Sequence, residues 1–292
     1  MSLPTNALER LQSVASEFGA TLSDDNSGQA SITITLPSGR QQNFELGLTF
    51  TDDAVSVSEN PVGAKLPSFC PDRHINLGGS FCLGWGADDP SIIDDVDAAR
   101  MWWSTLARYL AQQVVATKRS VWPGREHGRA HGDAAKDQAI AEDAAAKLGP
   151  AFAENAQAGR FKVRLDKRPG HTRLELWHAD KRLARISIRT KELVGDNILC
   201  PCDAPTGAQI AECGDHAEDL ATYMLALYRW RKADREFMGQ IAVKGIKCCG
   251  TLSSCGLRDA ALASGNTPKR SEKPNARRSK YYRPPTRSKR PR

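Results

Sequence analysis

The chain has 292 residues, of which 40% are hydrophobic and 26% are charged. This composition excludes a disordered or collagen-like protein, and the length allows about two domains of ordinary size. No apolar run reaches the roughly 18 residues needed to cross a bilayer, and the first residues lack the basic start and apolar stretch of a signal peptide. We therefore expect a cytoplasmic protein with no membrane contact.

The formal net charge of +7 is unevenly distributed along the chain. Residues 265–292 contain eleven Lys or Arg and one acidic residue, which gives +10, so residues 1–264 carry −3. A tail rich in proline and positive charge cannot bury a core, and we expect residues 264–292 to be disordered. Such a tail would bind nucleic acid weakly and without sequence preference.

The first third of the chain predicts an α+β domain with a helix packed on one face of an antiparallel sheet. Helical spacing of apolar residues indicates the helices, and alternation of apolar and polar residues indicates the strands. The predicted elements are a helix at 6–19, strands at 31–36 and 44–50, a short strand at 55–57, and a long helix that begins at Asp89-Pro90-Ser91. The expected buried stripe of the long helix is Val96, Ala99, Trp103, Leu106, Leu110 and Val114.

The remainder predicts a second, smaller α+β domain that is rich in cysteine. Its expected elements are a helix at about 134–148, a hairpin between 160 and 189, and a helix that begins near Asp215. The predicted boundaries are a first domain at 1–122, a helical linker at 123–159, a Cys-rich domain at 160–263 and the basic tail at 264–292.

The segment at 59–90 contains many prolines and glycines, which exclude long regular elements, and a loop of this length is often functional. It gathers His74, Asn76 and Cys82 within a few residues. A nucleophilic thiol needs access and a means of deprotonation, and acyl transfer needs a hydrogen-bond donor for the oxyanion, such as an Asn amide. Gly78 and Gly79 allow the backbone to fold His74 and Asn76 back towards Cys82.

His74-Ile75-Asn76, a glycine turn and Ser80-Phe81-Cys82-Leu83 resemble the active-site loop of ubiquitin-conjugating enzymes, above all the prokaryotic branch found in bacterial ubiquitin-like conjugation and antiphage defence operons. The resemblance implies that family's antiparallel meander with flanking helices. It also implies that Cys82 carries a protein C-terminus as a thioester, that Asn76 stabilises the oxyanion and that His74 organises the loop. Two features depart from the family pattern: Ile75 replaces the usual proline, and only five residues separate Asn76 from Cys82.

The same resemblance implies the partners of the reaction. No cofactor is needed for catalysis here, because an adenylating activating enzyme uses the ATP. The other partner would be a ubiquitin-like modifier, or a modified effector such as a cyclic-nucleotide synthase.

The last third offers more thiol and imidazole ligands than one structural zinc ion needs. A zinc site would draw on Cys200, Cys202, Cys213 and either His216 or Cys255, and the spacing does not choose between the last two. The alternative is a set of buried thiols around a small core. A third interpretation gives Cys248 and Cys249 an acceptor or redox role, although adjacent cysteines are poorly placed to bridge one another, which argues against a simple disulfide.

Two other functions are compatible with these residues. One is a cysteine hydrolase that uses Cys82 and His74, although papain-like enzymes have their histidine far downstream of the cysteine. The other is a zinc-containing nucleic-acid-binding protein that uses the basic tail. Near the candidate nucleophile, Cys70 is expected to be a buried small hydrophobe, and Asp72 and Arg73 a solvated pair or a means of steering a partner's tail.

Overall fold

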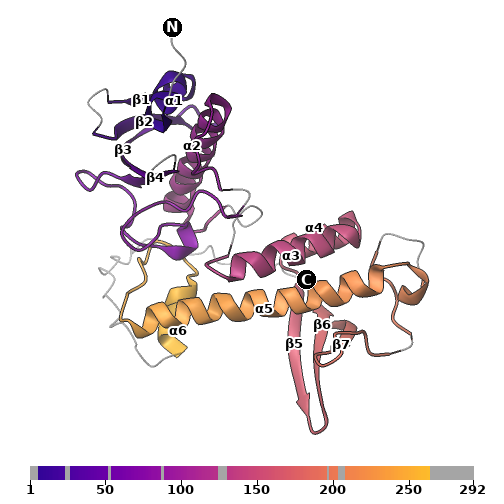
Figure 1. Ribbon diagram of the computed structural model, residues 1–292. Helices are drawn as coiled ribbons and strands as arrows, with labels where there is room; N and C mark the ends of the chain where they lie inside the picture. The colour runs from indigo at the N-terminus through magenta and orange to yellow at the C-terminus, as the bar shows by residue number, and fades with distance from the viewer. Residues whose placement is uncertain are drawn as a thin grey trace, which may run out of the picture.

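The structure is a computed structural model that describes residues 6–23, 27–51, 54–86, 89–123, 130–195, 197–202 and 208–263. The chain forms two units, each with its own antiparallel sheet and hydrophobic core. In Figure 1 the first unit stands over one end of the long helix of the second unit, and the irregular loop of the first unit lies between them. The predicted disordered tail lies outside the described residues.

The first unit is a four-stranded antiparallel meander with a helix before it and a helix after it. The strand order is β1-β2-β3-β4, and the predicted first helix, hairpin and third strand are confirmed. Strand β1 was not predicted, because three residues are too few to show a period. The elements are α1 (Ala7–Val14), a 3₁₀ turn η1 (Ala15–Phe18), β1 (Ala20–Leu22), β2 (Gln29–Thr35), β3 (Gln41–Thr51), β4 (Ala54–Glu59) and α2 (Val96–Arg119).

Helix α2 begins later than the sequence predicted. The cap is Asp95, whose Oδ1 accepts a hydrogen bond of 2.6 Å from the backbone N–H of Ala98, so the predicted start at residues 89–91 is wrong. The predicted buried stripe is confirmed, except that Val96 is only partly buried. Trp103 also donates a hydrogen bond of 3.0 Å from its indole Nε1 to the carbonyl of Leu11, which joins α2 to α1.

The second unit is built around one 28-residue helix. A three-stranded meander replaces the predicted hairpin at 160–189, and its order is β5-β6-β7. The two helices at 134–157, in the segment expected to be a linker, pack with the sheet and the long helix in one core. The elements are α3 (Ala134–Lys147), α4 (Pro150–Gln157), β5 (Phe161–Arg168), β6 (His171–His178), β7 (Lys181–Ser187), η4 (Ile210–Glu212), α5 (His216–Val243) and α6 (Gly256–Ala263).

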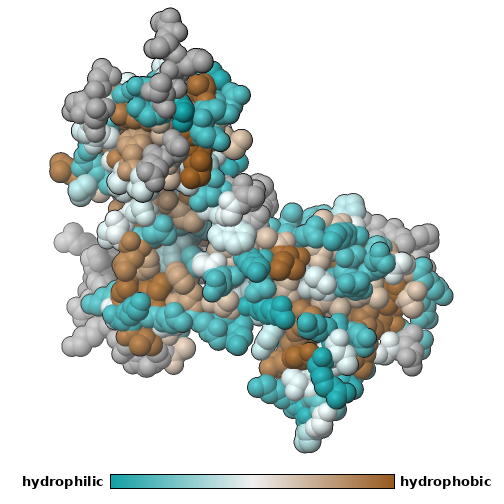
Figure 2. Space-filling model, in the orientation of Figure 1, coloured by the Kyte–Doolittle hydropathy of each residue, from teal (hydrophilic) through white to brown (hydrophobic). Residues whose placement is uncertain are grey.

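The surface of the second unit carries hydrophobic residues around the end of α5 that lies beside α6 (Figure 2). Val243 and Leu262 are 74% and 53% exposed there. Among the described helices, none is long and apolar enough to cross a bilayer.

Candidate active site and metal centre

The backbone of the long loop places Cys82 beside His74. A short 3₁₀ turn, η2 (Pro71–Arg73), ends at His74, which adopts the left-handed conformation with φ 55°. Ile75 then forms isolated β-bridges with Cys70 and Phe81. The N–H of Cys82 donates a hydrogen bond of 2.8 Å to the carbonyl of His74. The loop is therefore held by strand-like pairing across its glycine turn.

His74 contacts Cys82 through its carbonyl, and the contacts of its ring lie elsewhere. Tyr109 Oη donates to that same carbonyl at 3.1 Å, which anchors the loop to α2. The imidazole packs on Trp122 and His131, with ring centroids 5.5 Å and 6.0 Å away. Burial, assisted by the nearby His131, lowers the pKa of His74 to about 4. The ring is therefore neutral at pH 7.

Asn76 begins the tight turn that leads to Cys82. Its Nδ2 donates a hydrogen bond of 3.2 Å to Ser80 Oγ, and its backbone N–H donates to the Ser80 carbonyl at 2.8 Å. Gly78 and Gly79 have φ of 97° and 89°, a backbone conformation that residues other than glycine rarely adopt. One tight turn through these two glycines therefore accounts for the short spacing between Asn76 and Cys82.

Cys82 opens onto a cavity that both units line. Its thiol is partly buried and lies 3.6 Å from the Gly84 carbonyl. Burial, and then the negative charge of Asp89, raise the pKa of the Cys82 thiol above its usual value of 9.0. The cavity measures about 440 Å³ and also contains Asn76. Its apolar lining from the first unit is Phe69, Ile75, Leu77 and Trp85, and from the second unit Phe237, Ile241 and Ile246.

The second unit also brings a paired histidine to this cavity, which sequence reasoning missed. His131 Nδ1 lies 2.8 Å from Asp234 Oδ1, and the His131 ring stacks on Phe237 with centroids 4.9 Å apart. Burial is the largest single effect and opposes the charged ring, but the hydrogen bonds with Asp234 and the Pro71 backbone and the charges of Asp234 and Asp72 together outweigh it and raise the pKa of His131. The two residues are 103 positions apart in the chain, so no local motif could have predicted the pair.

Arg73 is a buried cross-link rather than part of a solvated pair. Its side chain is only 1% exposed, so that expectation is wrong. The guanidinium donates to Gln113 Oε1 at 2.7 Å and Thr117 Oγ1 at 2.8 Å, both on α2, and to Thr251 Oγ1 at 3.1 Å. Neighbouring Asp72 accepts a hydrogen bond of 2.9 Å from the N–H of Gly256 at the start of α6. The loop is therefore tied to the second unit as well as to α2.

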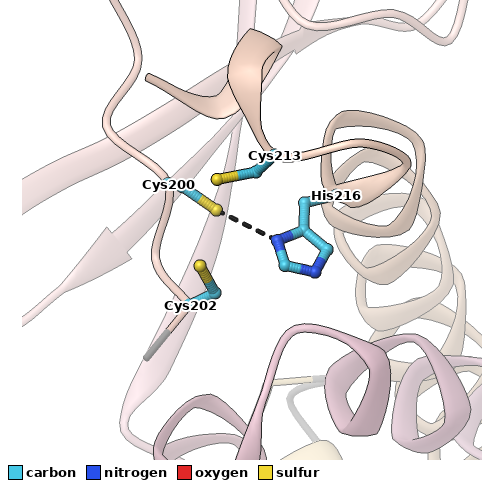
Figure 3. A group of neighbouring side chains, drawn as sticks. All are labelled: Cys200, Cys202, Cys213 and His216. Carbon is cyan, nitrogen blue, oxygen red and sulfur yellow. Dashed lines mark hydrogen bonds between the residues drawn. The ribbon is translucent and has the colours of Figure 1, made fainter. Parts of the chain in front are cut away.

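Three thiols and one imidazole meet in the second unit, as Figure 3 shows. The ligand atoms of Cys200, Cys202, Cys213 and His216 all lie within 4.8 Å of one another, and Cys200 Sγ is 3.3 Å from His216 Nδ1. Burial and the neighbouring thiols raise the pKa of Cys200 to about 12, because several thiolates cannot lie together without a cation. Three sulfurs and one nitrogen at these separations fit tetrahedral zinc, so this cluster can hold a structural zinc ion.

The structure places His216, rather than Cys255, in this cluster. His216 is the first residue of α5, and Cys255 follows the other end of that helix. A helix of 28 residues is about 40 Å long, so the two residues cannot share one ion. Cys255 is buried beside Met238 and Leu257 instead.

Comparison with known families follows the same division into two parts. Residues 18–124 match the family model described as "Prokaryotic E2 domain", where E2 is the class name of ubiquitin-conjugating enzymes. Residues 130–257 match "Cysteine-rich domain, C-terminal to E2 domain". No significant match was found among curated proteins or among solved structures. The chain belongs to a prokaryotic E2-like family whose E2 domain is followed by a Cys-rich domain, which confirms the resemblance and the α+β fold class.

Proposed function

We propose that this chain is a conjugating enzyme in which Cys82 accepts a protein C-terminus as a thioester and passes it to an acceptor nucleophile. The observation that carries the proposal is the position of the Cys82 thiol, which is partly exposed in a cavity at the end of a hydrogen-bonded loop of an E2 domain. A thiol in such a place is accessible to an incoming acyl group and is oriented by its surroundings.

Asn76 and His74 have different roles in the transfer reaction. Asn76 lines the same cavity, and its amide is the donor for the oxyanion that forms when an acceptor attacks. His74 shapes the loop through the carbonyl that binds the N–H of Cys82. This contact favours transfer over the alternative of a hydrolase, because a hydrolase would need the His74 ring as a base for the thiol, and that ring packs on Trp122 and His131.

The cavity also affects which protein C-terminus Cys82 can carry. An acyl group attached to Cys82 Sγ extends into the space around the sulfur, and apolar side chains from both domains line that space. The terminal residues of the carried protein therefore pass between the E2 domain and the Cys-rich domain. Small or apolar terminal residues suit the apolar side chains of this lining, which also includes His74, His131 and Lys244.

The reaction needs no cofactor at Cys82, because an adenylating activating enzyme supplies the activated C-terminus. The partners would be that enzyme and a ubiquitin-like modifier, or a modified effector such as a cyclic-nucleotide synthase. The setting we propose is antiphage defence in the bacterial cytoplasm, since the resemblance of the Cys82 loop is to proteins of such operons. The zinc cluster serves the fold of the Cys-rich domain, and the basic tail adds weak, salt-sensitive contacts with partners or nucleic acid.

The test is thioester formation with the adenylating enzyme and modifier from the same genomic neighbourhood. The wild-type chain is expected to form an adduct that a reducing agent cleaves, Cys82→Ser a more stable oxyester, and Cys82→Ala no adduct. Cys248→Ser is the matched control, because it removes another partly buried thiol that does not line the cavity. A reducible adduct that persists in Cys82→Ala would refute the proposal.

A further inference from the structure

Four cysteines outside the zinc cluster and the cavity gather where the two domains meet. Cys70 belongs to the E2 loop, while Cys248, Cys249 and Cys255 lie between α5 and α6. The sulfurs of Cys70 and Cys249 are 2.9 Å apart, although 179 positions separate them in the chain. Two thiols that the fold brings this close need little movement to form a bond.

The surroundings of this pair favour a thiolate at Cys249. Its Sγ lies 3.1 Å from Thr251 Oγ1, and that hydroxyl in turn accepts a hydrogen bond from the Arg73 guanidinium at 3.1 Å. The hydrogen bonds with the thiols of Cys248 and Cys70 lower the pKa of Cys249. The hydrogen bond with Cys249, and then burial, raise the pKa of Cys70. A thiolate at Cys249 thus faces the thiols of Cys70 and Cys248. The adjacent Cys248 is poorly placed to bridge Cys249, so Cys70 is the partner for oxidation to a disulfide.

We propose that Cys70 and Cys249 are a modification site at which a hydroperoxide forms a reversible disulfide between the two domains. The Cys249 thiolate attacks the peroxide O–O bond and becomes a sulfenic acid, and hydroxide leaves. The Cys70 sulfur then attacks the sulfenic sulfur, its proton leaves with the departing oxygen as water, and the S–S bond forms. In sum, two thiols and one hydrogen peroxide give one disulfide and two waters, and two electrons pass to the peroxide.

A second metal centre is the main alternative for these four thiols. Tetrahedral zinc brings all of its ligand atoms close to one another. Within the part of the chain that the structure describes, Cys200, Cys202, Cys213 and His216 are the residues whose ligand atoms meet that condition, and the group around Cys70 does not. The thiols form a chain in which Cys248 also contacts Cys249 and Cys255, rather than a compact set of four, and the close pair of Cys70 and Cys249 within it favours the disulfide.

The bond would act on the active-site loop without touching Cys82. Cys70 pairs through both its N–H and its carbonyl with Ile75, and Ile75 forms a bridge to Phe81, the residue before Cys82. A bond from Cys70 to Cys249 would hold the segment at 248–256 against this loop. The inference stands on the thiol pair alone and does not depend on the transfer reaction.

Peptide mapping of the purified full chain tests the site. The reduced protein is treated with hydrogen peroxide, free thiols are blocked with N-ethylmaleimide, and the tryptic peptides 66–73 and 248–258 are sought by mass spectrometry. We expect a cross-linked pair that is two hydrogens lighter than the sum of its parts and that a reductant separates. Cys249→Ser is expected to lose the link, while the matched variants Cys248→Ser and Cys255→Ser keep it.

Three outcomes would overturn the proposal. The first is that both peptides carry only N-ethylmaleimide after peroxide treatment. The second is an equal yield of linked peptides in Cys249→Ser, which would show that no particular pair is formed. The third is that the four thiols resist alkylation until a chelator removes a second zinc ion, which would make the group a metal centre.

Discussion

The buried imidazole of His74 makes the stability of the protein depend on pH in a direction that can be worked out from the structure. In the folded chain burial lowers its pKa to about 4, against 6.5 in an exposed histidine. Between these values the unfolded chain binds a proton that the folded chain does not, so acid stabilises the unfolded state. The contribution is fully present above pH 6.5 and is lost as the pH falls towards 4.

The size of the effect follows from the difference between the two pKa values. Each unit of pKa corresponds to about 1.4 kcal/mol, so the free energy of unfolding should fall by about 3 kcal/mol between pH 7 and pH 4 through His74 alone. The informative variant is His74→Asn, because Asn tolerates the left-handed backbone with φ 55° and does not titrate. Its free energy of unfolding should fall about 3 kcal/mol less than that of the wild type over the same range.

Urea unfolding at several pH values, followed by tryptophan fluorescence, measures this difference. Trp122 lies beside the His74 ring and reports on the same interface. His171→Asn is the matched control, because the same change is made at an exposed position. Equal losses of stability in wild type and His74→Asn would refute the reasoning, and would mean that the His74 ring is hydrated in solution.

Four further predictions follow from the site. Elemental analysis should find one zinc per chain, and Cys213→Ser should lose the zinc and melt at a lower temperature. If the purified protein contains no zinc and a chelator does not change its melting temperature, the cluster is a set of buried thiols instead. Asn76→Ala should slow transfer to an amine by about a hundred- to thousandfold while thioester formation changes little, and equal losses in both steps would make Asn76 a residue that only shapes the turn. Because the pKa of Cys82 is raised, its alkylation rate should still increase as the pH passes 9, and a plateau near neutral pH would contradict this. Truncation after Ser264 should leave thioester formation at Cys82 intact at high salt. If the truncated chain forms no thioester at high salt, the tail makes specific contacts.

The order of elements in the first domain could be predicted because it depends on contacts that are close in sequence. Alternation at 31–36 and 44–50 and the apolar stripe of α2 are local patterns, and the structure confirms both. The start of α2 was misplaced because Asp89-Pro90-Ser91 and Asp95 both look like a helix start. The hydrogen bond from the Ala98 N–H to Asp95 identifies Asp95 as the helix cap, and the sequence alone does not show that bond.

The parts of the site that depend on distant contacts could not be predicted. Arg73 is charged and was expected on the surface, yet Gln113 and Thr251, 40 and 178 residues away, satisfy its donors in the interior. In the same way, spacing alone could not choose between His216 and Cys255. The length of α5 separates them, and that length is a property of the folded helix.

The cavity around Cys82 has walls from two domains that meet only in the folded chain. Residues 69–85 supply one wall and residues 130–132 and 237–246 the other, so a change of side chain in one wall alters the fit of the other. The two domains therefore cannot be exchanged between relatives as independent modules. A chimera that joins this E2 domain to a foreign Cys-rich domain would inherit a mismatched cavity, even if each half folded correctly.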